Sequence, residues 1–341
     1  MTNPHSVSIV IPTYNGAVFL SDAMESVLNQ TRLPSEIIVV DDFSTDNTVE
    51  LAHRLAVTSK VPIKVIKLPI NSGGPARPIN TGVAAANGDL ILVLDQDDVL
   101  VPNALENGIQ VFDSHPSCDV VFHLGGRFEA PESGPIQSAQ LCHEMLQGRD
   151  GRTSILVGID DVAIYACRFG MIAYGYPGFI FRKSGWEAKR GVDESLRVAS
   201  DMDFFLWLAQ RGGAVLVPEI GYLRREHGNN VTHNAQAMYL ETGTVLVRFA
   251  CDMSARYPGH RVANDVFGFV FGLAYWFRVA HLYSESLQLI LLLDKLGIRK
   301  RERIVFRIKI MLHKYLSSLL RLKPTTSFFT RKILVRPLEP S

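Results

Sequence analysis

The sequence is poor in cysteine and has no long apolar run. Its 341 residues include four cysteines, far apart and without a C-x-x-C pair, which argues against a zinc knot or a disulfide framework and favours a reducing compartment. The longest apolar stretch, residues 266–277, is shorter than the ~20 residues needed to span a bilayer. The N-terminus lacks the basic and apolar regions of a secretion signal. We therefore expect a cytoplasmic protein.

Two common nucleotide-binding signatures are also missing. No G-x-G-x-x-G follows the first apolar segment, which disfavours a dinucleotide-binding domain, and the absence of G-x-x-x-x-G-K-S/T disfavours a P-loop NTPase. The composition, 47% hydrophobic and 20% charged, is that of a globular protein. A phosphate-bearing ligand would therefore have to be bound through a metal ion.

The formal net charge is only +1, but basic residues are concentrated near the C-terminus. Between Arg299 and Arg336 there are twelve Lys or Arg residues and one acid, Glu302, interleaved with large apolar side chains. This pattern is typical of an amphipathic segment on an anionic membrane surface. Nucleic acid is the weaker alternative because no recognised binding motif accompanies the segment, and a merely solvated helical face is a third. We expect peripheral association with the inner face of a membrane and no nucleic-acid partner.

The N-terminal half alternates short apolar runs with segments of helical periodicity. The runs predict buried strands at 7–12, 37–40, 63–68 and 90–94, and the periodic segments predict helices at 19–30, 49–55 and 79–86. This alternation predicts an α/β fold with a doubly wound, mostly parallel sheet.

Polar residues follow the predicted strands. Thr13, Tyr14 and Asn15 come after the first, Asp42 after the second, and Asp95 begins an acidic run after the fourth. Ligands of such sheets bind beyond the carboxyl ends of the strands. These residues are therefore candidates for a binding site.

The acidic run Asp95-Gln96-Asp97-Asp98 has two interpretations. If the strand continues, Asp95 and Asp97 point the same way and can converge on a divalent cation. Alternatively the acids belong to the N-terminus of a helix that begins near Pro102.

Four segments together, 7–15, 39–48, 80–82 and 94–98, resemble the opening motifs of family 2 glycosyltransferases, in order and at similar spacing. The resemblance covers roughly residues 6 to 115. It implies the nucleotide-sugar-binding fold called GT-A, inversion at the anomeric carbon and a bound Mn²⁺ or Mg²⁺.

The resemblance also assigns roles by position. Tyr14 would stack on the donor base, Asp42 would hydrogen-bond it, Asp95 would lie near the ribose and Asp97 would hold the metal. The implied donor-binding set also includes Pro12, Thr13, Asn15, Asn80 and Arg224. The chain departs from the family at Ile79, where arginine is common, and Arg77 could substitute from a neighbouring position.

The next part of the chain carries the expected acceptor side. We expect a strand at 118–124, a loop-rich insertion at 129–151 and a returning strand at 176–182. Asp201 resembles the aspartate of the family's Glu-Asp motif, which is the general base, with Ser200 in the place of the glutamate. The alternative is a helix cap, with Ser200 at the N-cap and Asp201 in the first turn.

Residues 222–232 look like the family's Tyr-Arg-x-His stretch. His227 would then be a further metal ligand, a role that imidazole can fill for Mn²⁺, and Arg224 or Arg225 would meet the diphosphate. Without the resemblance this run would be interpreted as a solvated loop.

The expected organisation is a GT-A domain at 1–235, with a nucleotide-sugar half at 1–115 and an acceptor half at 116–235, followed by a helical, basic region at 236–341. The expected function is inverting transfer of a sugar from a nucleotide-diphosphate donor, a UDP-sugar, to a hydroxyl of a glycan or lipid-linked acceptor in cell-surface glycan synthesis. The alternative is a nucleotide-sugar-binding protein without transfer activity. A nucleotidyltransferase is disfavoured because it would be expected to carry a basic Gly-rich loop near the first strand.

Overall fold

The computed structural model describes residues 5–148, 151–169, 172–228, 234–257, 262–280, 282–297 and 300–320. The chain divides into two compact units. The first consists of residues 1–162 and 171–230, and the second of residues 163–170 and 231–341. The described candidate site residues all lie in the first unit.

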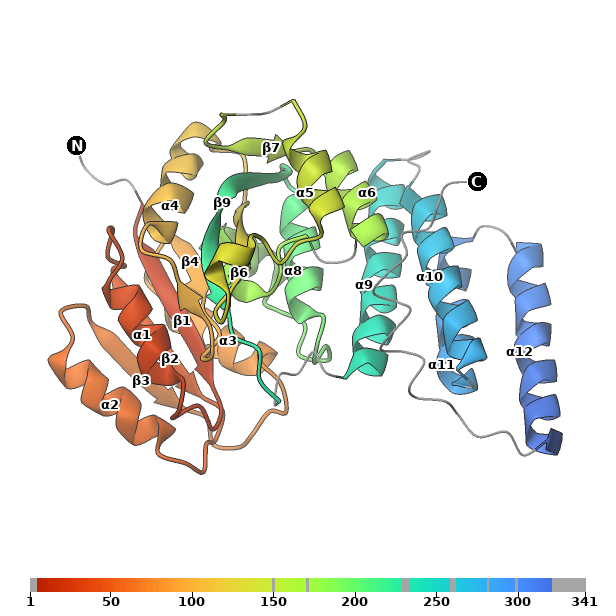
Figure 1. Cartoon of the computed structure of the whole chain (residues 1–341), viewed down its shortest axis with the longest axis horizontal. Helices are drawn as coiled ribbons and strands as arrows, with labels where there is room; N and C mark the ends of the chain where they lie inside the picture. Colours follow the sequence, from red (N-terminus) through yellow and green to blue (C-terminus); the bar gives the residue numbers. More distant parts are fainter. Residues whose placement is uncertain are drawn as a thin grey trace. The chain divides into compact units, whose positions relative to one another are not determined.

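The first unit is built on a nine-stranded sheet whose N-terminal part is parallel (Figure 1). Four strands lie in the order β3-β2-β1-β4, and each of these neighbouring pairs is parallel. Their bounds are β1 Val7–Thr13, β2 Glu36–Asp41, β3 Ile63–Lys67 and β4 Leu90–Val93, joined by α1 Leu20–Leu28, α2 Thr48–Thr58 and α3 Ala76–Ala85. The predicted doubly wound arrangement is confirmed.

Both faces of this parallel part are covered by helices, which is why its strands are apolar at consecutive positions. Ile9 of β1 packs in one core with Leu20 of α1 and Ile109 of α4 (Ala104–Ser114). On the opposite face, Val10 of β1 lies against Gly82 of α3, where a Cβ would collide with the valine side chain. The strand is buried along its whole length, and the exposed Tyr14 follows directly after its carboxyl end.

The rest of the sheet is mixed. β8 (Phe179–Arg182) runs antiparallel to β4 and to β6 (Val120–Arg127), and β6 runs parallel to β9 (Ala214–Arg224). The short strands β5 (Val99–Leu100) and β7 (Ile155–Val157) pair antiparallel with β9. Two helices, α7 (Lys183–Lys189) and α8 (Ser200–Ala209), lie between β8 and β9 in the chain. The returning strand next to β4 is thus where the sequence predicts it.

The predicted loop-rich insertion at 129–151 is wrong in part, because it contains a helix. A short 3-10 turn, Pro131–Ser133, precedes α5 (Ala139–Leu146). Ser138 caps α5 by accepting a hydrogen bond from the backbone N–H of Leu141 at 3.1 Å. Leu141 and Met145, four residues apart, are buried. Two apolar positions in a single short helix are too weak a periodicity to stand out among Pro, Gly and Ser.

The second unit is helical. Its long helices are α9 (Ala235–Arg256), α10 (Val262–Val279), α11 (Tyr283–Leu292) and α12 (Lys300–Leu320). Residues 163–169 of α6 (Ile159–Phe169) belong to the same unit. No helix within the described ranges is both long enough and apolar enough to cross a membrane. The end of the predicted basic segment, residues 321–341, lies outside the described residues.

Candidate active site

The acidic run after β4 forms a turn. β4 ends at Val93, and the backbone N–H of Asp98 donates to the carbonyl of Asp95 at 3.1 Å. The prediction that Asp95 and Asp97 alternate along an extended strand is therefore wrong. The helix-cap alternative is also wrong, because β5 intervenes and α4 begins only at Ala104. The acids lie on a turn at the carboxyl end of a central strand.

Gln96 ties this turn to the end of β1, a role that sequence reasoning missed. Its Oε1 accepts from the backbone N–H of Tyr14 at 2.9 Å, and its Nε2 donates to the Tyr14 carbonyl at 3.0 Å. Gly16 lies so close to the Gln96 amide that a Cβ at this position would collide with it and the amide would have to shift. The Tyr14 ring is left 47% exposed, as a side chain that stacks on a ligand would be.

Asn15 connects the segment after β1 to the loop after β2. It adopts a left-handed backbone conformation, with φ of 47°, which asparagine tolerates better than most residues. Its N–H donates to Ser44 Oγ at 2.8 Å, and its Oδ1 accepts from the Thr45 N–H at 2.9 Å. Pro12 and Thr13 are buried within β1, so their contribution is to this framework.

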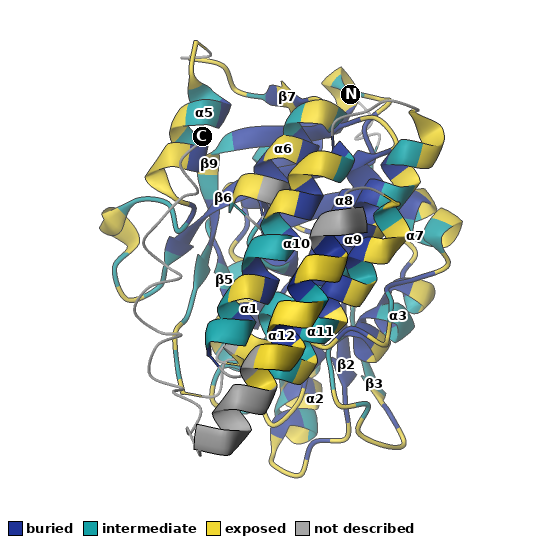
Figure 2. Ribbon diagram, turned by 90° about the vertical axis from the view of Figure 1, so that its right-hand side faces the viewer, coloured by how far each residue is buried: buried dark blue, intermediate teal, exposed yellow. Residues whose placement is uncertain are grey.

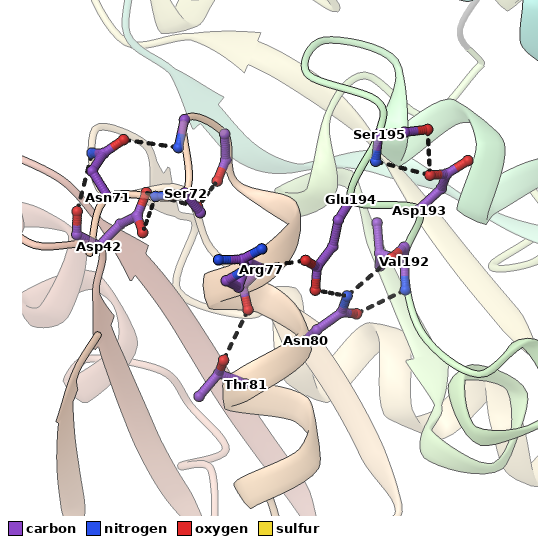
Figure 3. Close-up of polar contacts among 12 residues, drawn as sticks. Asp42, Asn71, Ser72, Arg77, Asn80, Thr81, Val192, Asp193, Glu194 and Ser195 are labelled. Atoms are coloured by element: carbon purple, nitrogen blue, oxygen red, sulfur yellow. Dashed lines mark hydrogen bonds and ion pairs between the residues drawn. The ribbon is translucent and has the colours of Figure 1, made fainter. Parts of the chain in front are cut away.

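Asp42 and Asn80 both have partners within the chain (Figure 3). Asp42 accepts from the Ser72 N–H at 2.9 Å and from the Ser72 hydroxyl at 2.8 Å. Asn80 binds Val192 from both sides of its amide, donating to the carbonyl at 2.9 Å and accepting from the N–H at 2.7 Å. Asn80 also donates to Glu194 Oε1 at 3.1 Å. Asn80 thus holds a segment that lies more than 100 residues later in the chain.

Arg77, the suggested substitute for the missing arginine, is engaged with the same segment. Its Nε donates to Glu194 Oε2 at 3.0 Å, and both side chains are more than 40% exposed (Figure 3). Hydrogen bonds from Asn80 and then from Arg77 lower the pKa of the Glu194 carboxyl. Arg77 therefore supports the segment that leads into α8.

The charge of Asp201, in α8, acts on the acidic turn. Burial raises the pKa of the Asp95 carboxyl well above its usual range, and the charges of Asp98, Asp97 and Asp201 raise it further. Burial and then Asp97 raise the pKa of Asp98 to about 8. The positive charge of Arg224 acts in the opposite direction on both. The fold has concentrated negative charge at one place, which a cation would stabilise.

The predicted cap at the start of α8 is not formed. Ala199 is the N-cap residue and makes no side-chain cap bond, while Ser200 is buried and accepts a hydrogen bond from the Tyr176 hydroxyl at 3.1 Å. Asp203, two residues beyond Asp201, forms an ion pair with Lys189 at 2.9 Å. Of the two acids in the first turn of α8, Asp203 forms this ion pair, whereas the charge of Asp201 acts on Asp95.

His227, from the segment after β9, contacts Asp97. The two side chains meet at 2.8 Å between Nε2 and Oδ2, and the imidazole ring stacks on Phe19 at 4.7 Å. Arg225 fixes this segment by donating from its N–H to Asp98 Oδ1 at 3.0 Å and from its guanidinium to Asp22 at 2.7 Å. The structure thus brings the two predicted metal ligands together from positions 130 residues apart.

A divalent cation fits these donors. A carboxylate and an imidazole suit Mn²⁺, and Mg²⁺ is commonly held by one or two carboxylates together with substrate phosphates. Besides burial, the charges of Asp98, Asp97 and Asp201 raise the pKa of the neighbouring Asp95, and the charge of Arg224 acts against them. Within the described part of the chain, no three His, Cys, Asp or Glu side chains form a metal-binding group. Asp97 and His227 are the two donors in contact here, and a cation held by them would need further oxygen atoms from a substrate.

The sheet and the acidic turn define the class of protein: an α/β protein of the GT-A fold, with its candidate site at the carboxyl ends of parallel strands. Residues 8–168 match the model of the family "Glycosyl transferase family 2". The crystal structure of Staphylococcus aureus TarS 1–349 in complex with UDP-GlcNAc superposes with a TM-score of 0.65 over 85% of this chain and 80% of that chain, at 21% identity.

Curated proteins with similar sequences have related names. The chain is 30% identical to the chondroitin synthase of Pasteurella multocida over 226 residues, which are 66% of this chain and 21% of that protein. It is 31% identical to the poly(ribitol-phosphate) β-N-acetylglucosaminyltransferase TarS of S. aureus over 121 residues, which are 35% of this chain and 21% of that protein. The chain thus spans about a fifth of the length of these relatives. Residues 8–168 thus form a domain of glycosyl transferase family 2.

Proposed function

We propose that the protein is an inverting glycosyltransferase that moves a sugar from a nucleotide-diphosphate donor to an acceptor hydroxyl. The observation that carries this proposal is the contact of His227 with Asp97 at 2.8 Å on the acidic turn, where the charge of Asp201 also acts on Asp95. A displacement at a sugar carbon requires a base for the acceptor hydroxyl and positive charge for the diphosphate that leaves. Asp201 would be the base, and a metal ion at the acidic turn would supply the charge.

The reaction follows from the positions of these residues. Asp201 accepts the proton of the acceptor hydroxyl while the acceptor oxygen forms a bond to C1 of the sugar. The bond between C1 and the phosphate oxygen breaks on the opposite face, and the nucleoside diphosphate leaves with the bonding electrons. Attack from the face opposite to the leaving group inverts the configuration at C1.

The donor would be held by the turns at the ends of β1, β2 and β4. The exposed Tyr14 ring would stack on the base, Asp42 would hydrogen-bond it, and Asp95 would lie near the ribose. Arg224, whose charge acts on the acidic turn, would meet the diphosphate. A divalent cation bound by Asp97 and His227 would supply positive charge to the diphosphate leaving group.

A UDP-sugar donor and a cell-surface glycan acceptor have support from the similar proteins. TarS has been crystallised with UDP and with UDP-GlcNAc. The two relatives described above are named as a chondroitin synthase and a poly(ribitol-phosphate) β-N-acetylglucosaminyltransferase. We extend the same roles to this chain as part of the proposal. The alternative acceptor is a lipid-linked one, which would lie in a membrane. The basic C-terminal region would then bring the protein to that membrane.

The test is a screen of the purified chain against UDP-, GDP- and dTDP-sugars with Mn²⁺. The proposal predicts that one nucleotide class raises the melting temperature only when Mn²⁺ is present, and that the same donor is slowly hydrolysed. A thermal shift without hydrolysis or transfer in any acceptor mixture would support a protein that binds nucleotide-sugars without transferring them. No shift with any donor would overturn both.

A further inference from the structure

The outward face of α12 carries an unusual set of side chains. Five large apolar residues are each between 46% and 58% exposed: Ile304, Val305, Ile308, Met311 and Leu312. We call them the outer stripe. At about 100° per residue they fall on one side of the helix, over about two and a half turns. Figure 2 shows α12 running across the surface of the second unit with exposed residues along it.

The inward face of the same helix already explains how α12 packs. Phe306 and Ile310 are buried, and the Phe306 ring lies 4.6 Å from that of Phe271 in α10. Arg303 is buried and donates to the Leu293 carbonyl at 3.0 Å. The outer stripe is therefore not needed to attach α12 to its own unit.

The charges beside the outer stripe indicate what covers it. Lys309 and Lys314 are exposed, and on the helical wheel they fall on opposite flanks of the stripe. Five further basic residues follow in the sequence, with no acid until Glu339: Arg321, Lys323, Arg331, Lys332 and Arg336. An apolar stripe between cationic flanks is complementary to a surface that is apolar inside and anionic at its edge.

A second copy of the chain fits the outer stripe less well. Packing two such helices together would bring lysines of like charge near one another. Five half-exposed side chains also offer a few hundred Å², whereas each partner of a stable interface buries about 800 Å². The charge pattern therefore favours lipid over a second copy.

We propose that α12 lies in the headgroup region of an anionic membrane, with the outer stripe inserted among the acyl chains and Lys309 and Lys314 at the level of the lipid phosphates. This deepens the proposed membrane attachment by assigning it to specific residues of a described helix. The attachment is independent of glycosyl transfer, since it involves no residue of the candidate active site.

The test is co-sedimentation of the full-length chain with vesicles of equal parts phosphatidylglycerol and phosphatidylcholine. We expect the parent to bind and the stripe variant Ile308→Gln/Met311→Gln to lose about ten-fold or more in partition at any salt concentration. The lysine variant Lys309→Gln/Lys314→Gln should lose about five-fold for each lysine at low salt and little at high salt. A matched control, Val57→Gln/Leu156→Gln, alters two exposed apolar residues elsewhere and should bind like the parent.

Three outcomes would overturn the proposal. One is equal partition of the parent and the stripe variant. Another is loss of binding when the five basic residues of 321–341 are changed to Gln, with the stripe variant unaffected, which would assign binding to charge in that segment alone. The third is a parent that is dimeric by light scattering, does not bind vesicles and becomes monomeric in the stripe variant, which would assign the stripe to a second copy. Donor-induced thermal shifts of the same variants report separately on the proposed transferase.

Discussion

Asp97 is the carboxylate to which we assign the proposed cation site. It is in contact with His227 and belongs to a turn rather than to a packed core. Asp97→Asn should lower Mn²⁺-dependent donor affinity by at least about ten-fold and leave the melting temperature of the free protein nearly unchanged. Isothermal titration with and without Mn²⁺ measures this effect, and Asp113→Asn, at a 52% exposed side chain of α4, is the control. Unaltered Mn²⁺-dependent binding by the Asp97 variant would remove this residue from the metal site.

Asp201 and Asp203 form a natural pair for testing the general base. Asp201→Asn should retain donor affinity and lower kcat by about 10²- to 10⁴-fold, because a base acts mainly in the transition state. Asp203→Asn breaks the nearly buried ion pair with Lys189 and should lower stability by about 3 kcal/mol while turnover of the folded enzyme persists. Steady-state kinetics and urea unfolding of both variants separate the two roles. Loss of turnover only in the Asp203 variant would reverse the assignment.

The sequence predicts which residues form the site better than it predicts the hydrogen bonds between them. Asp97 and His227 were both predicted, and the structure brings them into contact. The pairing of Gln96 with the Tyr14 backbone could not be predicted, because a glutamine between two aspartates has no spacing that reveals a partner 82 residues away. The available signal was Gly16, since a glycine after a strand can mark a close approach by another part of the chain.

At the scale of elements, Asn80 connects α3 to the segment that precedes α8. Asn80→Ala would leave the N–H and carbonyl of Val192 without their side-chain partners, and we expect a loss of about 2 kcal/mol in the free energy of unfolding. Turnover should fall as well, because this segment leads to Asp201. Thr81→Ala removes one exposed hydrogen bond within the same helix and is the control, with an expected loss below about 0.5 kcal/mol.

The outcome of the Asn80 experiment also distinguishes two roles for this residue. If Asn80 acts by positioning the segment, the variant loses stability in the absence of donor. If its role is the donor contact predicted from the family resemblance, the variant keeps its stability and shows a raised KM for the donor. Chemical denaturation without donor, followed by donor titration, gives both quantities on one sample.

Elements with strong periodicity were predictable, and those defined by distant pairing were not. β1 and β4 are continuous apolar runs, so their burial in a parallel sheet follows from the sequence. α5 was missed because only Leu141 and Met145 face inward. β5 has two residues and exists because it pairs with β9, more than 120 residues later. Such a pairing leaves no local pattern.

At the scale of the whole molecule, His123 links stability to pH. It is buried in β6, its Nε2 has no hydrogen-bond partner, and burial lowers the pKa of its imidazole from 6.5 to about 4. The folded state therefore keeps His123 neutral while the unfolded chain takes up a proton below pH 6.5. The contribution of neutral His123 to the free energy of unfolding is therefore fully present above pH 6.5. As the pH falls towards 4, up to about 3 kcal/mol of this free energy is lost.

A matched pair of variants measures this contribution. His123→Leu should flatten the dependence of the unfolding free energy on pH between 6.5 and 4, whereas His143→Leu, at an exposed position of α5, should leave it as in the parent. Urea unfolding at closely spaced pH values provides the comparison. Parallel pH profiles for the parent and the His123 variant would show that this histidine does not titrate with unfolding.

The central claim, inverting transfer of a sugar from a nucleotide-diphosphate donor, is tested most directly by the configuration of the first product. The purified chain is mixed with Mn²⁺ and an α-linked UDP-sugar in an NMR tube, and the anomeric proton of the released or transferred sugar is followed before mutarotation. Attack assisted by Asp201 from the face opposite to the diphosphate predicts that the β-anomer appears first. Initial formation of the α-anomer would contradict the account.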